Sequence, residues 1–322
     1  MRLTWPDYTF RTRVCGVRID ASRAPHAPPW KGRCVRRFDY YSPATLDEAL
    51  TIARERGDGG RFLAGGTDVL IHLKEGGLHP SYVVDLRRLR ELEGIEERGD
   101  GLRIGAATTM ADIAAHPAVR SRYASIADGA GVVGSVQTRN MATIGGNVCN
   151  AAPSADVSPG LVVHAARAVV RGPSGERRLA VEEFWTGPGG NVLAPGEICV
   201  AFEVPAPPTR SASVYQRHTP RKEMDIAVVG VAVYLALGGD GTLETARIAL
   251  GAVAPTVIRA PEAEAALKGQ RPEGEALTRA AEAAAAAARP IDDVRGTAEF
   301  RRYLVGVMTA RLIERAAAAA RA

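Results

Sequence analysis

Two short segments, each built around a pair of adjacent glycines, most constrain what this sequence can fold into. The first is Leu63–Leu70 (LAGGTDVL) and the second is Ala142–Val148 (ATIGGNV), and each places a hydroxyl and a carboxylate or amide beside its glycines. Adjacent glycines let a backbone turn sharply and approach a ligand without a Cβ in the way. The N–H groups of such a turn can hold a phosphate. Gly-Gly pairs also occur in ordinary turns, but two copies of this chemistry predict a ligand with two phosphates.

The length and composition are those of a soluble globular protein with room for two domains. Of the 322 residues, 46% are hydrophobic and 24% are charged, which are ordinary fractions for that class. The sequence contains no apolar run long enough to cross a bilayer, and no signal-peptide core near its N-terminus. We therefore expect a cytoplasmic protein with no transmembrane segment.

The first 34 residues differ in charge from the rest. They carry seven basic and two acidic side chains, a net charge of +5, whereas residues 35–322 carry 34 of each sign. The positive balance is a property of this tail and does not indicate a nucleic-acid-binding face. With little periodicity and four prolines, residues 1–34 have two interpretations. They are a disordered basic extension, or the start is assigned too early and Val35 is the initiator.

The spacing of cysteines and histidines argues against a metal site in this chain. The four cysteines, Cys15, Cys34, Cys149 and Cys199, match no C-x-x-C or iron–sulfur pattern, and we interpret them as free thiols. The six histidines have no partner at metal-ligand or catalytic-triad spacing. We expect no metal ligands, and only His218 is a candidate for a position near a cofactor.

Local patterns predict a mixed α+β first part. Thr45-Leu46-Asp47-Glu48 is a capping box that opens a helix, and Gly57 ends it. The apolar run 161–170 fits either a helix or a strand. Strands are expected over residues 61–64, 82–86, 102–106 and 198–204, and short helices over 68–74, from 109 and over 121–131.

The second part begins after the clearest linker of the chain, residues 205–209. We therefore predict one domain over 35–208 and another over 209–322. Two apolar runs flank the turn Gly238–Gly241, which is a β-hairpin signal. The runs cover 227–237 and 243–250, and Ala-rich helices are expected over 261–267, 273–288 and 299–320.

The pairing of AGGTD with TIGGN, and an Asp156 nine residues beyond Asn147, resembles the FAD-binding medium subunits of molybdenum hydroxylases. That family includes aerobic carbon monoxide dehydrogenase and bacterial xanthine dehydrogenases, and the resemblance runs from about Arg36 to the C-terminus. It implies an α+β fold, with a two-part FAD-binding domain of the vanillyl-alcohol-oxidase/p-cresol-methylhydroxylase type. A small antiparallel sheet with packed helices follows. FAD is the implied cofactor, with the chemistry on the flavin and no catalytic side chain.

Several positions match residues that contact FAD in that family. The two Gly-Gly segments match its pyrophosphate-binding segments, and Asp156 either binds a polar group of the ligand or caps the next helix. Arg217 stands where relatives often have Lys, and a cation at the flavin edge favours reduced flavin. Val133 and Cys199 have core packing and a plain strand as alternatives. The predicted cofactor-binding residues are Phe62, Leu63, Ala64, Gly65, Gly66, Thr67, Asp68, Val69, Val133, Thr143, Ile144, Gly145, Gly146, Asn147, Asp156, Cys199 and Arg217.

The resemblance implies an oxidoreductase subunit that works only with partners. A molybdopterin-containing large subunit oxidises substrate, a small [2Fe–2S] subunit passes electrons to FAD on this chain, and NAD or a quinone is the external acceptor. Three alternatives stay open. They are a stand-alone flavin oxidase of the same fold, a nucleotide-sugar reductase, and a flavin-free scaffold. Neither Gly-Gly segment contains a histidine for a covalent flavin link, which disfavours the first.

Overall fold

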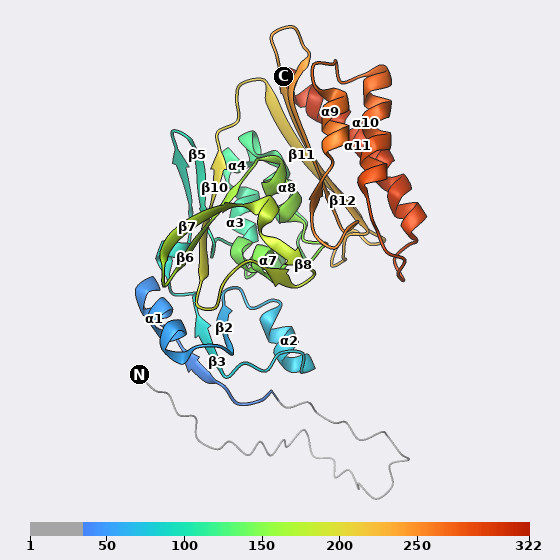
Figure 1. The fold of residues 1–322 in the computed structure, drawn as a ribbon. Helices are drawn as coiled ribbons and strands as arrows, with labels where there is room; N and C mark the ends of the chain where they lie inside the picture. The colour runs from blue at the N-terminus through green and yellow to red at the C-terminus, as the bar shows by residue number, and fades with distance from the viewer. Residues whose placement is uncertain (1–34) are drawn as a thin grey trace, which may run out of the picture. The chain divides into compact units, whose positions relative to one another are not determined.

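The computed structural model describes residues 35–322, which form one contiguous unit of helices and sheets (Figure 1). Both interpretations of residues 1–34 concern a segment outside this range. The strands are β1 (Asp39–Tyr41), β2 (Gly60–Leu63), β3 (Tyr82–Asp85), β4 (Ile95–Arg98), β5 (Gly101–Gly105), β6 (Arg167–Gly172), β7 (Gly175–Ala180), β8 (Trp185–Gly187), β9 (Gly190–Asn191), β10 (Ile198–Pro205), β11 (Ser211–His218), β12 (Val229–Leu237), β13 (Leu243–Gly251) and β14 (Ile258–Arg259). The α-helices are α1 (Leu46–Arg56), α2 (Val69–Glu75), α3 (Met110–Ala115), α4 (Pro117–Arg122), α5 (Ala124–Gly131), α6 (Val136–Arg139), α7 (Ile144–Asn150), α8 (Val157–Val163), α9 (Pro261–Leu267), α10 (Gly274–Ala287) and α11 (Ala298–Arg321). Two 3-10 helices are η2 (Arg90–Leu92) and η3 (Val181–Glu183).

The first sheet contains three parallel strands in the order β1-β3-β2. The capping box predicted at the start of α1 is confirmed, because the Thr45 side chain accepts a hydrogen bond from the Glu48 N–H at 3.2 Å. The Glu48 carboxylate in turn accepts one from the Ala44 N–H at 2.7 Å. Gly57 ends α1 with a φ of 65°. β2 runs directly into the first Gly-Gly segment, so this sheet determines where that segment lies.

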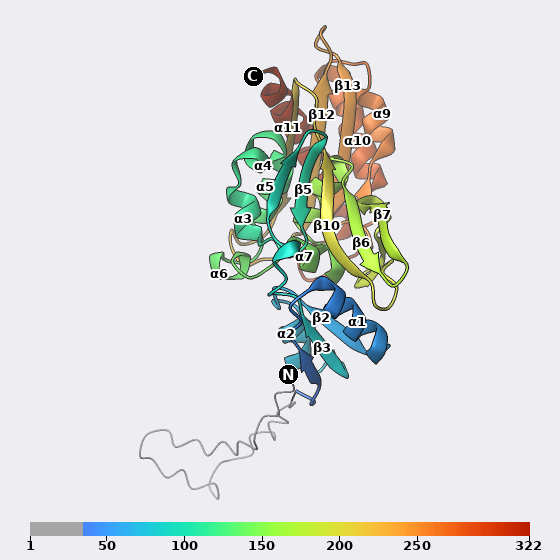
Figure 2. The ribbon, with the colours of Figure 1, turned by 90° about the vertical axis from the view of Figure 1, so that its left-hand side faces the viewer.

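β10 is the central strand of a five-stranded antiparallel sheet with the order β4-β5-β10-β6-β7 (Figure 2). Cys199 and Phe202 pack into the main core, whereas Ile198 and Val200 pack into a smaller core that also contains residues of the first sheet. The strand predicted over 198–204 is confirmed. Its continuous apolar character follows from burial on both faces.

One predicted helix is two helices in the structure. The sequence predicts a helix over 121–131, but α4 ends at Arg122 and α5 begins at Ala124. Tyr123 between them has φ −133° and ψ 44°, and its ring is fully buried in the main core. Tertiary packing of this side chain overrides the helical propensity of the segment.

The ambiguous run 161–170 contains both a helix and a strand. α8 ends at Val163, and β6 begins at Arg167. Ala165 between them has a left-handed φ of 53°, the backbone conformation that commonly ends a helix.

The C-terminal sheet is antiparallel in the order β11-β12-β13-β14, and α9, α10 and α11 cover one of its faces (Figure 1). β12 is buried along its whole length. Val231 and Val233 pack into the core formed with these three helices, whereas Ala232 and Tyr234 pack into the main core with residues of α5 and α8. The hairpin and the three helices predicted from the sequence are confirmed.

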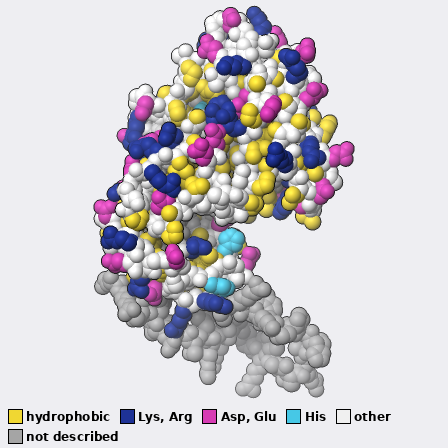
Figure 3. Space-filling model, viewed as in Figure 1, with side chains coloured by type: hydrophobic (Ala, Val, Ile, Leu, Met, Phe, Trp, Pro, Cys, Tyr) yellow, Lys and Arg dark blue, Asp and Glu magenta, His cyan; other side chains and the backbone are white. Residues whose placement is uncertain are grey.

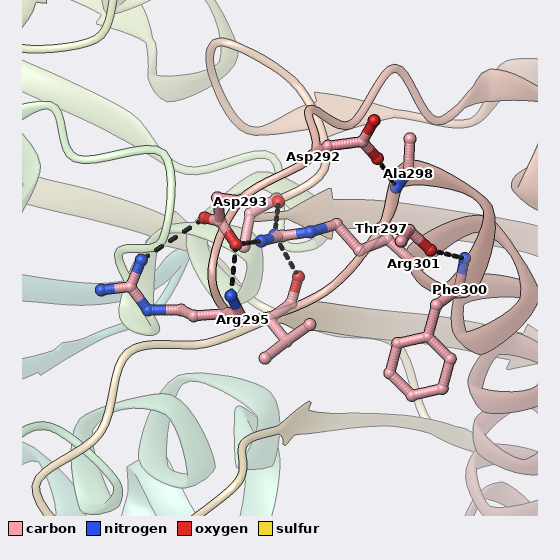
Figure 4. A network of polar contacts seen from close by, with 9 residues as sticks. Asp292, Asp293, Arg295, Thr297, Ala298, Phe300 and Arg301 are labelled. Atoms are coloured by element: carbon pink, nitrogen blue, oxygen red, sulfur yellow. Dashed lines mark hydrogen bonds and ion pairs between the residues drawn. The ribbon is translucent and has the colours of Figure 1, made fainter.

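A buried cation holds the loop that connects α10 to α11 (Figure 4). Arg301 donates to the carbonyl oxygens of Val228 and Ala252 at 2.8 and 3.1 Å, and to the Asp293 carboxylate at 2.6 Å. The same carboxylate accepts a hydrogen bond from the Arg295 N–H at 2.8 Å. These contacts fix the start of α11 against the beginning of β12.

The surface carries mixed charge. Lys and Arg side chains alternate with Asp and Glu over the face shown in Figure 3, which agrees with equal numbers of acidic and basic side chains in residues 35–322. Among residues 35–322, no helix has the length and apolar character that crossing a membrane requires.

Candidate functional site

The first Gly-Gly segment is the turn between β2 and α2. Gly66 has a φ of +77°, a left-handed conformation that favours glycine. Within residues 35–322, no oxygen accepts a hydrogen bond from the backbone N–H groups of Gly65, Gly66 or Thr67. Successive free N–H groups in a turn form a concave site for an anion. This turn can therefore accept a phosphate oxygen.

Gly65 also brings the first segment against the second. A Cβ at this position would lie 1.9 Å from the carbonyl oxygen of Met141, so only glycine lets the two backbones come this close. Met141 directly precedes Ala142, where the second segment begins. The two Gly-Gly segments are therefore neighbours in the fold, although they are far apart in the sequence.

The second segment begins a helix and is not the sharp turn that its glycines predict. Thr143 is the N-cap of α7, and its side chain accepts a hydrogen bond from the Gly146 N–H at 3.1 Å. The Gly145 N–H donates to the carbonyl oxygen of Ala106 at 2.8 Å. Because these donors are used inside the protein, the run of successive backbone N–H groups without an acceptor in residues 35–322 belongs to the first segment.

Asn147 supplies an unpaired polar atom beside the same helix. Its side chain is half-buried, and its Oδ1 is buried with no hydrogen-bond donor among residues 35–322. A buried acceptor left unpaired costs about 1–3 kcal/mol. A bound ligand that donates a hydrogen bond to Asn147 would remove that cost.

Asp156 and Arg217, which the sequence singles out separately, form a buried ion pair. Arg217 Nη1 lies 2.6 Å from Asp156 Oδ2, and the two side chains are 6% and 9% exposed. The Tyr215 hydroxyl donates to Asp156 Oδ1 at 2.7 Å. Burial raises the pKa of Asp156 to about 6, against the opposing effects of Arg217 and both hydrogen bonds. Asp156 occupies the N-cap position of α8, but its side chain makes no capping hydrogen bond there and is bound by Arg217 and Tyr215 instead.

A cavity of about 420 Å³ includes two members of this cluster in its wall. Three cations and one carboxylate contribute to it, which suits a ligand with several hydrogen-bond acceptors. Sequence reasoning missed Asp128 and Arg315, because they lie on helices whose positions only the fold reveals. The lining residues are Asp128, Val132, Tyr215, Gln216, Arg217, Thr219, Lys222 and Arg315. A second cavity, of about 660 Å³, lies in the C-terminal part and is lined by none of the predicted site residues.

The other residues that the sequence singles out are Cys199, Val133 and His218. The thiol of Cys199, on β10, donates to the Ala201 carbonyl oxygen at 3.9 Å, and its interaction with Cys149 of α7, together with burial, raises the pKa of the Cys199 thiol. Val133 is half-buried just after α5. The His218 ring packs edge-on against Phe300, with 5.9 Å between ring centroids. Cys199 is thus brought to the helix of the second Gly-Gly segment.

The first predicted segment spans a strand, a turn and a helix. Phe62 and Leu63 end β2, residues 64–68 form the turn, and Val69 begins α2. Only the turn carries the free N–H groups described above. Among residues 35–322, no cluster of His, Cys, Asp and Glu could hold a metal ion.

Comparison with known proteins identifies the family of this chain. Residues 36–207 match the FAD binding domain in molybdopterin dehydrogenase, and residues 215–316 match the CO dehydrogenase flavoprotein C-terminal domain. The chain therefore belongs to the FAD-binding subunit family of the molybdopterin dehydrogenases. The predicted α+β fold and family are confirmed. The division at residue 208 stays a prediction.

Individual relatives are similar over most of their length. The carbon monoxide dehydrogenase medium chain of Hydrogenophaga pseudoflava is 33% identical over 280 residues, which are 87% of this chain and 97% of that one. The xanthine dehydrogenase FAD-binding subunit of Escherichia coli O157:H7 is 34% identical over 283 residues, 87% of this chain and 96% of that one.

A solved structure is similar in three dimensions as well. The carbon monoxide dehydrogenase from H. pseudoflava that lacks the Mo-pyranopterin moiety superimposes with a TM-score of 0.85 at 34% identity. The match covers 88% of this chain and 98% of that chain. These relatives are components of oxidoreductases.

Proposed function

We propose that this chain is the FAD-binding electron-transfer subunit of a heteromeric molybdenum hydroxylase in the cytoplasm. The observation that carries the proposal is the junction of the two Gly-Gly segments. Gly65 sits against Met141, and the neighbouring N–H groups of the first segment have no acceptor within residues 35–322 and could bind phosphate oxygens. A dinucleotide cofactor with two adjacent phosphates fits that arrangement.

The residues that would hold FAD are those of the predicted set. In the first segment, the N–H groups of residues 65–67 would bind the pyrophosphate. In the second segment, Asn147 would accept a hydrogen bond from the cofactor, because its buried Oδ1 has no donor in the described protein. Asp156 and Arg217 would contact the flavin half of the cofactor from beside the 420 Å³ cavity. The bound flavin would supply the redox chemistry.

Partner subunits are part of this proposal, because the relatives named above are a medium chain and an FAD-binding subunit. Within residues 35–322, the two cysteines Cys149 and Cys199 are free thiols and no metal-ligand cluster exists. We propose that a small [2Fe–2S] subunit delivers electrons and that a molybdopterin-containing large subunit oxidises the substrate. An external acceptor, NAD or a quinone, would then receive the electrons from the flavin.

The absorption spectrum of the purified chain, recorded before and after acid precipitation, tests this proposal. We expect flavin bands near ~450 nm that move wholly into the supernatant, because non-covalent FAD is released when the fold is lost. Flavin retained in the pellet would indicate a covalent link and favour the stand-alone oxidase. Absence of flavin even after incubation with FAD would overturn the cofactor assignment and leave the scaffold alternative.

A further inference from the structure

Within residues 35–322, the Tyr215 hydroxyl makes a single hydrogen bond. It donates to Asp156 Oδ1 at 2.7 Å, while Arg217 Nη1 donates to Oδ2 of the same carboxylate at 2.6 Å. One buried carboxylate is therefore held on both of its oxygens by two side chains of β11. Tyr215 is itself buried, with 5% of its surface exposed, so its hydroxyl depends on Asp156 for a hydrogen bond.

Neighbouring elements fix Tyr215 and Asp156 in place. The Tyr215 N–H donates to the Asp128 carboxylate at 3.1 Å. A Cβ on Gly129 would lie 2.4 Å from the carbonyl oxygen of Asp156, and a Cβ on Gly230 would lie 2.7 Å from the Tyr215 hydroxyl. Two glycines thus leave room for the Asp156 backbone and the Tyr215 side chain. This close packing holds the Asp156 carboxylate in one position.

Packing alone does not account for the hydroxyl. A phenylalanine ring would fill the same volume, and an apolar group would avoid burying a polar atom. We propose that Tyr215 is a positioning residue of the flavin site: its hydroxyl fixes the Asp156 carboxylate, and that carboxylate fixes the Arg217 guanidinium at the wall of the cofactor cavity. This inference rests on the proposed FAD-binding function.

The arrangement links the cation to the protonation of Asp156. The charged group in contact with the carboxylate is Arg217 on β11. Asp128 on α5, Arg315 on α11 and Lys222 line the cavity that Arg217 also lines, and Asp128 accepts the Tyr215 N–H. When Asp156 takes up a proton, Arg217 loses its counter-charge and its field at the flavin becomes more positive. The hydroxyl stabilises the ionised carboxylate, so its removal moves that protonation to higher pH.

The flavin midpoint potential, measured from pH 5 to pH 8, provides the test. Asp156→Asn removes the titrating group and gives the profile of the flavin by itself. Because Asn cannot ionise, we expect the wild-type potential to lie below this reference at pH 8 and to deviate upward toward it below about pH 6, where Asp156 is protonated. In Tyr215→Phe the same deviation should begin about one pH unit higher, as expected for the loss of a hydrogen bond to a charged group. Tyr234→Phe, a buried tyrosine on β12, is the matched control and should follow the wild type.

Each outcome separates this inference from the proposed function. A wild-type chain that binds no FAD contradicts the function itself. Bound FAD with identical profiles in wild type and Tyr215→Phe overturns the positioning role. If Tyr215→Phe does not fold, Gly230→Ala replaces it, because the added Cβ displaces the hydroxyl from the opposite strand. The same upward shift supports the inference, and an unchanged profile rejects it.

Discussion

Gly145 and Gly146 are adjacent in the sequence, yet a methyl group at each would meet different neighbours. At Gly145 a Cβ would lie 2.7 Å from both the Cβ and the carbonyl oxygen of Ala106, whereas at Gly146 it would lie 2.9 Å from the Thr143 hydroxyl. The Ala106 backbone cannot move aside for an added methyl group, whereas the Thr143 side chain can rotate away from one. We expect Gly145→Ala to lower the free energy of unfolding by about 3 kcal/mol and Gly146→Ala by about 1 kcal/mol or less.

Urea unfolding of both variants measures this difference. Gly99→Ala is the matched control, because a Cβ there meets nothing within 4 Å. Equal losses at Gly145 and Gly146 would contradict the argument from close approach. They would indicate that the pair is required for backbone flexibility instead.

His164 makes stability depend on pH. Its ring lies between Tyr123 and Tyr234, with centroid distances of 5.1 and 5.2 Å. Burial lowers the pKa of His164 to about 3. Unfolded histidine titrates at about 6.5, so between these values the unfolded state binds more protons and stability falls as the pH falls. We expect His164 to remove about 2 kcal/mol of unfolding free energy between pH 7 and pH 5.

The measurement compares wild type with His164→Gln by urea unfolding at pH 7, 6 and 5. Asp156 has the opposite effect. Because its pKa is raised to about 6 in the folded protein, its contribution lowers the free energy of unfolding as the pH rises toward that value. The informative quantity is therefore the difference between the two proteins at each pH. His72→Gln, at an exposed histidine, serves as control. A constant difference would contradict a neutral, buried His164.

At the residue scale the sequence identifies site members but not their pairing. Asp156 and Arg217 stand out by their positions in matching segments, yet no local pattern indicates that they form an ion pair. Their contact depends on β11 lying beside the start of α8. The role of Gly65 is equally hidden, because the backbone that it approaches belongs to Met141.

At the scale of one element, Arg301 determines how α11 begins. Its side chain is 4% exposed and pairs with Asp293 at 2.6 Å, and it also caps two backbone carbonyls (Figure 4). Arg301→Met would remove the donor to those two carbonyls and the buried cation that pairs with the Asp293 carboxylate. We expect a loss of about 3 kcal/mol in unfolding free energy.

Denaturant unfolding with Arg302→Met as control tests this expectation. Arg302 is exposed and makes one long hydrogen bond, at 3.5 Å to the Ala288 carbonyl oxygen. Arg302 carries the same charge as Arg301 and lies on the same helix, so the comparison of the two variants measures the effect of burying the cation. Similar losses in both variants would contradict the role assigned to the buried network.

Local signals predict elements well where they act alone. α9 begins at Pro261 as the sequence predicts, because proline at the first helical position is a strong local signal. Local signals fail where tertiary packing determines the backbone conformation. Tyr123 interrupts a helical pattern because its ring is buried, and the second Gly-Gly segment becomes helical because Thr143 caps it.

At the scale of the molecule, the two parts recognised in the sequence share one core. Tyr215, Ala232 and Tyr234 of the C-terminal sheet pack in the same cluster as Val157 and Leu161 of α8. The ion pair between Asp156 and Arg217 joins the same two parts. Residues 35–322 should therefore unfold together, although the sequence contains a clear linker.

Binding of FAD should stabilise that whole unit. FAD at one hundred times its dissociation constant adds about 2.7 kcal/mol to the native state, which corresponds to a rise of about 4 °C in the melting temperature for a chain of this size. Because the proposed contacts come from residues 65–67, Asn147 and Arg217, the cofactor touches both parts. Calorimetry should show one transition that moves upward as FAD is added. Two transitions of which only one moves would place the cofactor on one part alone and contradict the contact with Arg217.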